Sequence, residues 1–208
     1  MMNPRFEAVY RVSTHKKCIA LTFDIGWGGK VPTPVLDALQ ASRVKKATFF
    51  LSSTWVLERP LLARKIKNQG YEIGSHGRLH ENYTEHSNRW IIREVKAAEN
   101  TIRKATGVKC KLIRTPNGDM NERVIQLLSS LGYSTIHWSK DSMDWTNPGV
   151  RTIIRNSTTE VKPGDILLLH ASDSARQTAR ALPSIIRKLR RQGYVFVTVS
   201  ELLRMRTK

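Results

Sequence analysis

The sequence predicts an α/β domain in which parallel strands alternate with helices, either as a barrel or as an open doubly wound sheet. Three observations support this prediction. Short apolar or β-branched runs recur with amphipathic segments between them. Glycine follows several of the amphipathic segments, in NQG, ATG, SLG and RQG, as it does at helix C-termini. No Pro-, Gly- or Ser-rich linker and no internal repeat divides the 208 residues, so they form one domain.

The strands and helices can be assigned in order along the chain. Seven runs have the composition of buried strands: CIALTF, ATFFL, YEIGS, KLIR, YSTIHW, DILLLH and YVFVTV. Helices are expected over residues 33–42, 54–68, 88–106, 121–131, 148–160 and 175–192, with a last one after Ser200. The pattern is clearest in the third helix, where Ile91, Val95, Ala98 and Ile102 form one apolar stripe.

The composition indicates a globular protein with a strongly basic surface. Lys and Arg number 35 against 17 Asp and Glu, which leaves a formal net charge of +18. Such a charge favours polyanionic partners, although a solvated basic surface without a dedicated partner explains it equally well. Basic and aromatic residues do not alternate as on a single-strand-binding platform, so a specific nucleic-acid partner is not predicted. Oligomeric state is left open.

The cysteines and the ends of the chain add little. Cys18 and Cys110 have no metal-site spacing and make no disulfide framework, so both are expected to be buried as small apolar residues. The first residues, MMNPRFEAVYRVSTHKK, lack the continuous apolar stretch of a secretory signal. No run of about 18 apolar residues predicts a transmembrane segment.

Polar residues collect where the predicted strands end, which is where active sites lie in parallel α/β barrels. Each has an ordinary explanation on its own: a structural histidine, an arginine at a helix C-terminus, or a turn with an aromatic plug. Their coincidence at one barrel mouth favours a functional site. The set consists of Asp24, His76, His80, Arg114, Asp141, Asp144, Trp145 and His170.

This set suits metal-assisted hydrolysis of an amide or ester. His76 and His80, at i and i+4, can reach one divalent metal and leave positions open for water and substrate. A metal held in this way polarises a carbonyl and activates water for a nearby carboxylate base. A histidine from a separate strand can then protonate the leaving group.

Five motifs, TFDIG, SHGRLH, RTPNG, DSMDW and LLLH, occur in the order found in the polysaccharide deacetylases with a NodB homology domain, carbohydrate esterase family four. The chain resembles this family over residues 8–204 and is most similar to its sporulation-associated PdaB-type branch. The resemblance implies a distorted (β/α)7 barrel over residues 16–205, preceded by an N-terminal extension over residues 1–15. It also implies removal of acetyl groups from N-acetylated amino sugars of peptidoglycan or chitin-like glycan.

The resemblance further implies a role for each matching residue. Asp24 would be the catalytic base, oriented by Arg114, and His170 the catalytic acid, tuned by Asp141. His76 and His80 would bind a divalent metal, zinc or alternatively cobalt. Asn117 would contribute a backbone N–H to the oxyanion, and Trp145 and Leu168 would line the sugar groove.

Ile25 departs from the family pattern, which has an aspartate as third metal ligand at this position. Without it the two-histidine site is neutral and should hold zinc less tightly. Water could fill the gap, Asp24 could become a ligand, or the site could stay mostly empty. A metal-dependent N-deacetylase is therefore the first hypothesis, and a catalytically silent glycan-binding protein is the second. A nucleic-acid-binding barrel and a hydrolase for another acyl substrate remain as alternatives. A cell-wall or spore-associated extracytoplasmic location would suit the first two.

Overall fold

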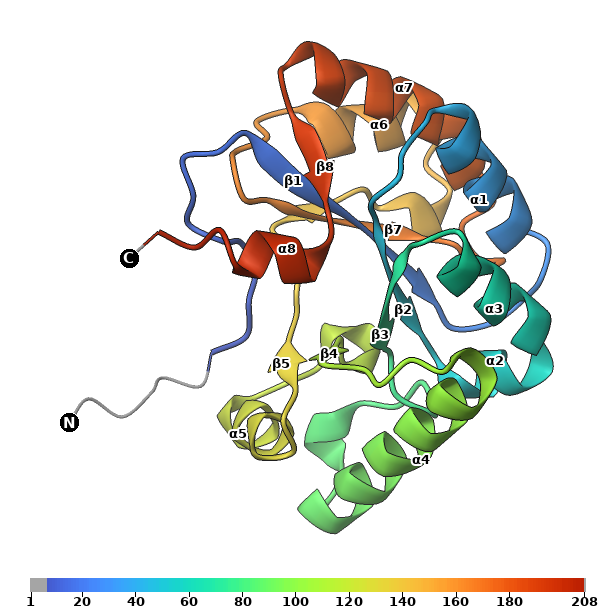
Figure 1. Ribbon diagram of the computed structural model, residues 1–208, viewed down its shortest axis with the longest axis vertical. Helices are drawn as coiled ribbons and strands as arrows, with labels where there is room; N and C mark the ends of the chain where they lie inside the picture. Colours follow the sequence, from blue (N-terminus) through green and yellow to red (C-terminus); the bar gives the residue numbers. More distant parts are fainter. Residues whose placement is uncertain (1–6, 208) are drawn as a thin grey trace.

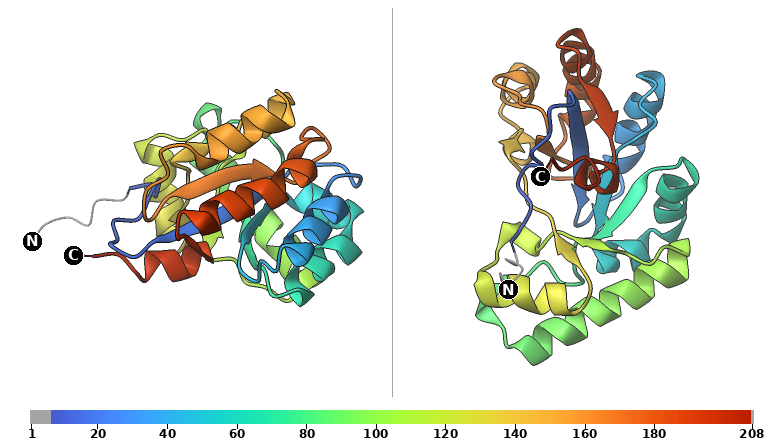
Figure 2. Two further views of the ribbon diagram at one scale, coloured as in Figure 1. Left: turned by 90° about the horizontal axis from the view of Figure 1, so that it is seen from above. Right: turned by 60° about the vertical axis from the view of Figure 1, so that its left-hand side comes forward.

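The computed structural model describes residues 7–207 and shows one sheet of parallel strands that curls into a barrel-like half-cylinder (Figure 1). Helices cover its outside, with α4 at one end and α6 and α7 at the other (Figure 2). The strand order is β5-β4-β3-β2-β1-β7-β6, and β8 pairs with the beginning of β1. The predicted distorted barrel is confirmed.

The bounds of the strands and helices follow the chain in this order. The strands are β1 (Cys18–Ile25), β2 (Thr48–Leu51), β3 (Glu72–Ser75), β4 (Leu112–Ile113), β5 (Ser134–Thr135), β6 (Lys140–Asp141), β7 (Ile166–His170) and β8 (Val195–Val197). The α-helices are α1 (Pro32–Ala41), α2 (Ser53–Glu58), α3 (Pro60–Asn68), α4 (Asn88–Thr106), α5 (Glu122–Ser130), α6 (Val150–Thr158), α7 (Thr178–Arg191) and α8 (Val199–Leu203). Short 3-10 turns, η1 (Tyr83–Glu85), η2 (Pro116–Gly118) and η3 (Asp144–Thr146), lie between them.

Two sequence predictions need correction. The helix expected over residues 54–68 is two helices, α2 and α3, because Pro60 cannot continue the first and restricts the preceding Arg59 to a non-helical backbone. Strand β6 was not predicted, because its two residues carry charged side chains and no apolar pattern. The predicted helix 88–106 agrees with α4, which begins at a Ser87 cap and ends at a left-handed Gly107.

Strand β1 is buried along its whole length and separates two apolar layers. Alternate side chains of a strand point to opposite faces. Leu21, Phe23 and Ile25 pack in the core between the sheet and the outer helices. Ala20 packs in a smaller cluster that fills the barrel interior. Asp24 follows this inner face, which places it at the top of the interior, whereas Ile25 belongs to the helix-facing core.

The N-terminal extension contributes to the barrel wall. Val9 bridges to Ile136 just after β5, and Arg11 bridges to Asp165 just before β7. The Arg11 guanidinium also pairs with the buried Asp165 carboxylate. The described part of the extension, residues 7–15, therefore spans from the β5 side to the β7 side, while residues 1–6 lie outside the described part of the chain.

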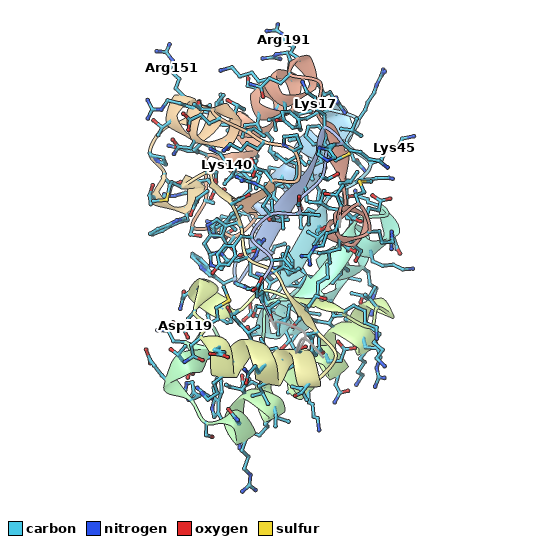
Figure 3. All side chains as sticks on the ribbon, turned by 90° about the vertical axis from the view of Figure 1, so that its left-hand side faces the viewer. Lys17, Lys45, Asp119, Lys140, Arg151 and Arg191 are labelled. Atoms are coloured by element: carbon cyan, nitrogen blue, oxygen red, sulfur yellow. The ribbon has the colours of Figure 1, made fainter. Side chains whose placement is uncertain are left out.

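The surface and the cysteines agree with their predictions. Cys18 and Cys110 are buried and unpaired. Arg151 on α6 and Arg191 on α7 point away from the body of the molecule (Figure 3). Within residues 7–207, every helix is too short or too polar to cross a membrane.

Candidate active site

A pocket of about 550 Å³ opens at the carboxyl ends of the strands. Nine residues were given a role by the family resemblance; eight of them line the pocket, and the ninth, Arg114, is fully buried. These lining residues come from β1, β6, β7 and the loops after β3, β4 and β6. They are Asp24, His76, His80, Asn117, Asp141, Trp145, Leu168 and His170.

Asp24 is held by Arg114 in a buried ion pair. Arg114 Nη1 donates to Asp24 Oδ1 at 2.8 Å and to Thr22 Oγ1 at 2.9 Å. Its Nη2 donates to the backbone oxygen of His137 at 2.9 Å. The guanidinium also stacks over Phe50, 4.3 Å from the ring centroid. The carboxylate is thereby fixed on one side, and its other oxygen remains directed at the pocket.

The electrostatics keep Asp24 ionised. Burial has the largest single effect and would raise the pKa of its carboxyl group. The charge and hydrogen bond of Arg114, together with the electrostatic influence of His76 and His170, outweigh burial and lower the pKa below its ordinary value. A deprotonated carboxylate is the state that a general base requires.

His170 lies across the pocket, held by Asp144. Its Nδ1 is 2.7 Å from Asp144 Oδ1, and its backbone N–H donates to Asp144 Oδ2 at 2.8 Å. Thr178 Oγ1 donates to the same Oδ2 at 2.6 Å, so the buried carboxylate is well satisfied. Burial lowers the pKa of the imidazole, but the hydrogen bond and charge of Asp144, together with the charges of Asp24 and Asp141, outweigh it and raise the pKa above its ordinary value.

This contact refines one prediction. Asp141 was expected to tune His170, and its charge does raise the pKa of the imidazole, but the aspartate in direct contact with the ring is Asp144. Asp141 lines the pocket, and its Oδ1 accepts from the backbone N–H of Met143 at 2.8 Å. Met143 has a left-handed backbone, φ 56°, which turns the chain so that Asp144 points toward His170. The signal was present in the sequence, since Asp144 stood among the candidates, but spacing could not choose between two aspartates in one loop.

His76 and His80 lie together on the loop after β3. Their ring centroids are 5.4 Å apart. His76 Nδ1 lies 2.8 Å from the Arg114 backbone oxygen, a contact in which the ring nitrogen must donate. Nε2 is then left with its lone pair 3.9 Å from Asp24 Oδ2. Burial lowers the pKa of His76 to about 4, and burial also lowers the pKa of His80. Both imidazoles are therefore neutral at neutral pH, as metal ligands must be.

The loop that carries these histidines is held firmly. Ser52 Oγ and Thr54 Oγ1 both donate to the Arg78 backbone oxygen, at 3.0 and 3.1 Å. The buried Glu94 accepts from Arg78 Nη1 and from the Leu79 backbone N–H, each at 3.3 Å. Gly77 has φ 73°, and a Cβ there would lie 2.5 Å from the Tyr83 hydroxyl oxygen. Only glycine fits this turn.

The donor set suits two ligand positions of a divalent ion. Two neutral imidazoles beside a carboxylate oxygen have the chemistry that zinc prefers. Among residues 7–207, however, no three His, Cys, Asp or Glu side chains form a group that could hold a metal. Ile25, at the position of the family's third ligand, is fully buried and does not line the pocket. The side chains present therefore fit a metal with two protein ligands and leave a third place unfilled.

The rest of the pocket lining includes several aromatic and apolar side chains. Trp145 is 50 % exposed at the rim, and Leu168 is buried in the wall. Asn117 has a left-handed backbone, φ 58°, in the turn after β4, and its side chain donates to Asn82 Oδ1 at 2.9 Å. The sequence analysis did not single out Trp27, Trp138 or Ser172, which also line the pocket. Ser172 Oγ accepts from the Gly26 backbone N–H at 2.8 Å and so ties the turn after β1 to β7.

Comparison with known proteins identifies the family of the chain. The family model described as polysaccharide deacetylase matches residues 11–136, more than half of the chain. The chain belongs to the polysaccharide deacetylase family. It is 36 % identical over 207 residues to a protein of Bacillus cereus named peptidoglycan-N-acetylglucosamine deacetylase, covering 98 % of this chain and 96 % of the relative. It is 32 % identical over 203 residues to the peptidoglycan-N-acetylmuramic acid deacetylase PdaA of Bacillus subtilis, covering 96 % and 76 %.

A solved structure adds a contrasting neighbour. A protein of Bacillus anthracis described as a family 4 carbohydrate esterase pseudoenzyme superimposes with a TM-score of 0.89 at 30 % identity, covering 97 % of this chain and 70 % of that one. A mutant of the same pseudoenzyme is described as having restored enzymatic activity. Proteins similar to this chain therefore include some named as deacetylases and at least one described as a pseudoenzyme.

Proposed function

We propose that this polysaccharide deacetylase removes acetyl groups from N-acetylated amino sugars of a cell-wall glycan of the peptidoglycan type. The observation that supports it most directly is the opposed pair of titratable groups in one pocket. Arg114 favours the deprotonated form of Asp24, and Asp144 favours the protonated form of His170 by raising its pKa. Groups whose pKa values are pushed apart in this way suit the base and the acid of one reaction.

The chain's own residues then divide the work as follows. Asp24 Oδ2 takes a proton from the water that attacks the acetamide carbonyl. The backbone N–H of Asn117 stabilises the oxyanion as the carbonyl becomes tetrahedral. His170 gives a proton to the amine as the C–N bond breaks, and acetate and a free amino sugar leave. Trp145 and Leu168 hold the sugar face in the groove.

His76 and His80 would hold a divalent metal, zinc or alternatively cobalt, with modest affinity because position 25 supplies no carboxylate. When bound, such an ion polarises the acetamide carbonyl and lowers the pKa of the attacking water. The neutral state of both imidazoles and the tautomer fixed by the Arg114 backbone oxygen support this assignment.

A catalytically silent, glycan-binding function is the second candidate, and one observation favours it. Ile25 is buried in the helix-facing core, and the pocket holds no third metal ligand from the described residues. The likeness to a protein described as a pseudoenzyme supports the same alternative. Under either function we place the protein in the PdaB-type branch, at an extracytoplasmic cell-wall or spore location.

Acetate release from peptidoglycan fragments and chitooligosaccharides tests the proposal, with metal first stripped by a chelator and then restored as zinc or cobalt. Release that depends on metal and falls about 10²–10⁴-fold in His170→Ala supports the deacetylase. Acetate release by the metal-stripped protein, without added metal, would show that the reaction does not need the proposed metal. Glycan binding by folded protein without release under any metal would leave the silent function.

A further inference from the structure

A second, smaller pocket adjoins the active-site pocket. Its volume is about 370 Å³, and it is lined by Trp27, Lys30, Val31, Asp173, Ser174 and Arg176. Trp27 and Ser174 line both pockets, so the two lie side by side along the rim of the barrel. A polymer that enters the active site has this second pocket as a direct continuation.

Trp27 forms the wall between the pockets on a loop that is fixed. The Asp173 carboxylate accepts from three successive backbone N–H groups, those of Gly29 at 3.2 Å and of Lys30 and Val31 at 2.9 Å. Trp55 Nε1 donates to the Gly28 backbone oxygen at 2.7 Å. A Cβ on Gly28, whose φ is 91°, would lie 2.2 Å from Asp173 Cγ, so only glycine permits this close approach.

The indole is exposed although its loop is rigid. Trp27 is 57 % exposed, while Trp145 is 50 % exposed in the same active-site pocket. Isolated exposed aromatics are common and need no special explanation. This one, however, stands between two cavities on a loop already ordered by the protein. A ligand that stacks on it would not bear the entropic cost of ordering that loop.

The second pocket is also cationic. Lys30 and Arg176 are both exposed along it. Among the described residues, no side-chain hydrogen bond or ion pair engages either cationic group. The only acidic side chain of the pocket, Asp173, directs its oxygens at the three backbone N–H groups. Two unpaired cations beside an aromatic face fit a sugar that carries a carboxylate.

We propose that this pocket is a second sugar subsite, in which a neighbouring unit of the glycan stacks on Trp27 and places an acidic substituent between Lys30 and Arg176. The inference rests on the proposed function and deepens it. The ligand is a glycan with carboxylate-bearing amino sugars, as opposed to a neutral chitin-like chain. The preference for acidic glycan is set at this subsite, one unit away from the reacting acetamide.

The test compares two peptide-free tetrasaccharides of equal length, one neutral and one with carboxylate ether substituents, by calorimetric binding at 0.1 M salt. Wild type should bind the acidic tetramer more tightly. Lys30→Gln/Arg176→Gln should weaken the acidic tetramer by about three- to tenfold and leave the neutral one unchanged. The control Lys45→Gln/Arg151→Gln removes the same charge from distant exposed positions and should change neither. Trp27→Ala should weaken both tetramers about tenfold, and Trp27→Tyr should restore most of the loss.

Several results would overturn the subsite. Equal affinity of wild type for the two tetramers would do so. So would an equal loss of affinity for the acidic tetramer in the two double variants, because the effect would then come from net charge and not from the pocket. Binding of a single-stranded oligonucleotide that depends on Lys30 and Arg176, without any such dependence for the acidic tetramer, would assign the pocket to nucleic acid. Acetate release from the neutral tetramer, measured in parallel, separates the two proposals. Absent release with intact discrimination in binding rejects the deacetylase alone, and release without discrimination rejects the subsite alone.

Discussion

Replacing Ile25 by aspartate tests whether the histidine pair is a metal site that lacks one ligand. Position 25 ends β1 between two positions that approach the histidines. Asp24 Oδ2 is 3.9 Å from His76 Nε2, and a Cβ on Gly26 would lie 3.6 Å from His80 Cδ2. A carboxylate at position 25 would join them if the strand end turned its side chain from the helix-facing core toward the pocket.

The magnitude can be worked out from burial. Ile25 is fully buried, so losing its side chain costs about 2 kcal/mol of apolar burial. An unpaired carboxylate in its place adds roughly 3 kcal/mol. The metal-free variant should thus lose about 5 kcal/mol, a melting temperature lower by roughly 10–20 °C for a chain of this length. Zinc at about 1,000 times its Kd should return about 4 kcal/mol, because it binds only the folded state.

The assay is thermal unfolding against zinc concentration, with zinc affinity measured by calorimetry. Ile25→Asn is the matched control. Asparagine has nearly the same shape as aspartate and loses the same apolar burial, but it supplies no anionic ligand. We expect zinc to raise the melting temperature of Ile25→Asp by about 8–16 °C, and that of Ile25→Asn and wild type much less. Equal zinc shifts in all three proteins would refute the reasoning and show that residue 25 stays in the helix-facing core.

Three further predictions concern the acid, the base and the histidine loop. Asp144→Asn should remove the hydrogen bond and the charge that contribute most to raising the pKa of His170, so the loss of activity with rising pH should begin at lower pH. Asp141→Asn should shift this limb in the same direction but by less, because its charge is the smallest of the contributions; pH–rate profiles of acetate release compare the two. The pKa of His170 in the folded protein lies above its ordinary value. Its contribution to the free energy of unfolding is therefore fully present below the ordinary imidazole pKa and is lost as pH rises through the raised folded-state pKa. Urea unfolding at a series of pH values should show this loss in wild type and not in Asp144→Asn. Arg114→Met should lower the free energy of unfolding in urea by about 3–5 kcal/mol, because it leaves Asp24 charged and buried without a partner. The double variant Arg114→Met/Asp24→Leu should recover much of that loss. If Arg114→Met alone were as stable as wild type, the buried ion pair would be contradicted. Gly77→Ala should lower both metal affinity and stability, because the added Cβ collides with the Tyr83 hydroxyl. Calorimetry measures the affinity and thermal unfolding the stability. In the matched control Gly70→Ala the added Cβ has nothing within 4 Å, so this change should affect stability only.

The location of the site was predictable from the sequence, because parallel strands deliver their C-terminal residues to one mouth. Asp24 is the residue before the last of β1 and His170 is the last of β7, and the pairing of these two strands sets them opposite each other. That proximity follows from the order of the strands in the sheet, which the sequence did not predict. The partner of His170 was not predictable in the same way. Two aspartates lie three positions apart in one loop, and a single left-handed residue, Met143, decides which of them reaches the imidazole.

The second pocket shows a different limit of sequence reasoning. TFDIGWGG drew attention to Asp24 and Ile25, while Trp27 read as part of a glycine-rich turn. What makes Trp27 a candidate is Asp173, nearly 150 positions later, whose carboxylate fixes the turn from β7's side of the barrel. A contact of that separation has no local pattern. The break at Pro60, by contrast, was visible in the sequence, and the prediction of one long helix over residues 54–68 did not take it into account.

The buried polar groups weigh on the choice between an enzyme and a silent binding protein. Arg114 is fully buried, and its guanidinium combines polar partners such as Asp24 with apolar contact to the Phe50 ring. Replacing a buried ion pair of this kind by apolar side chains is often neutral or stabilising. Glycan binding alone needs the rim of the pocket, with Trp145 and Trp27, and does not need a carboxylate fixed on a guanidinium below it. The Asp24–Arg114 pair therefore makes physical sense chiefly as a positioned base, which favours catalysis. Because Ile25 supplies no ligand, the histidine pair is expected to bind metal only modestly. We therefore expect the zinc concentration, more than the acid–base pair, to decide whether the protein deacetylates glycan.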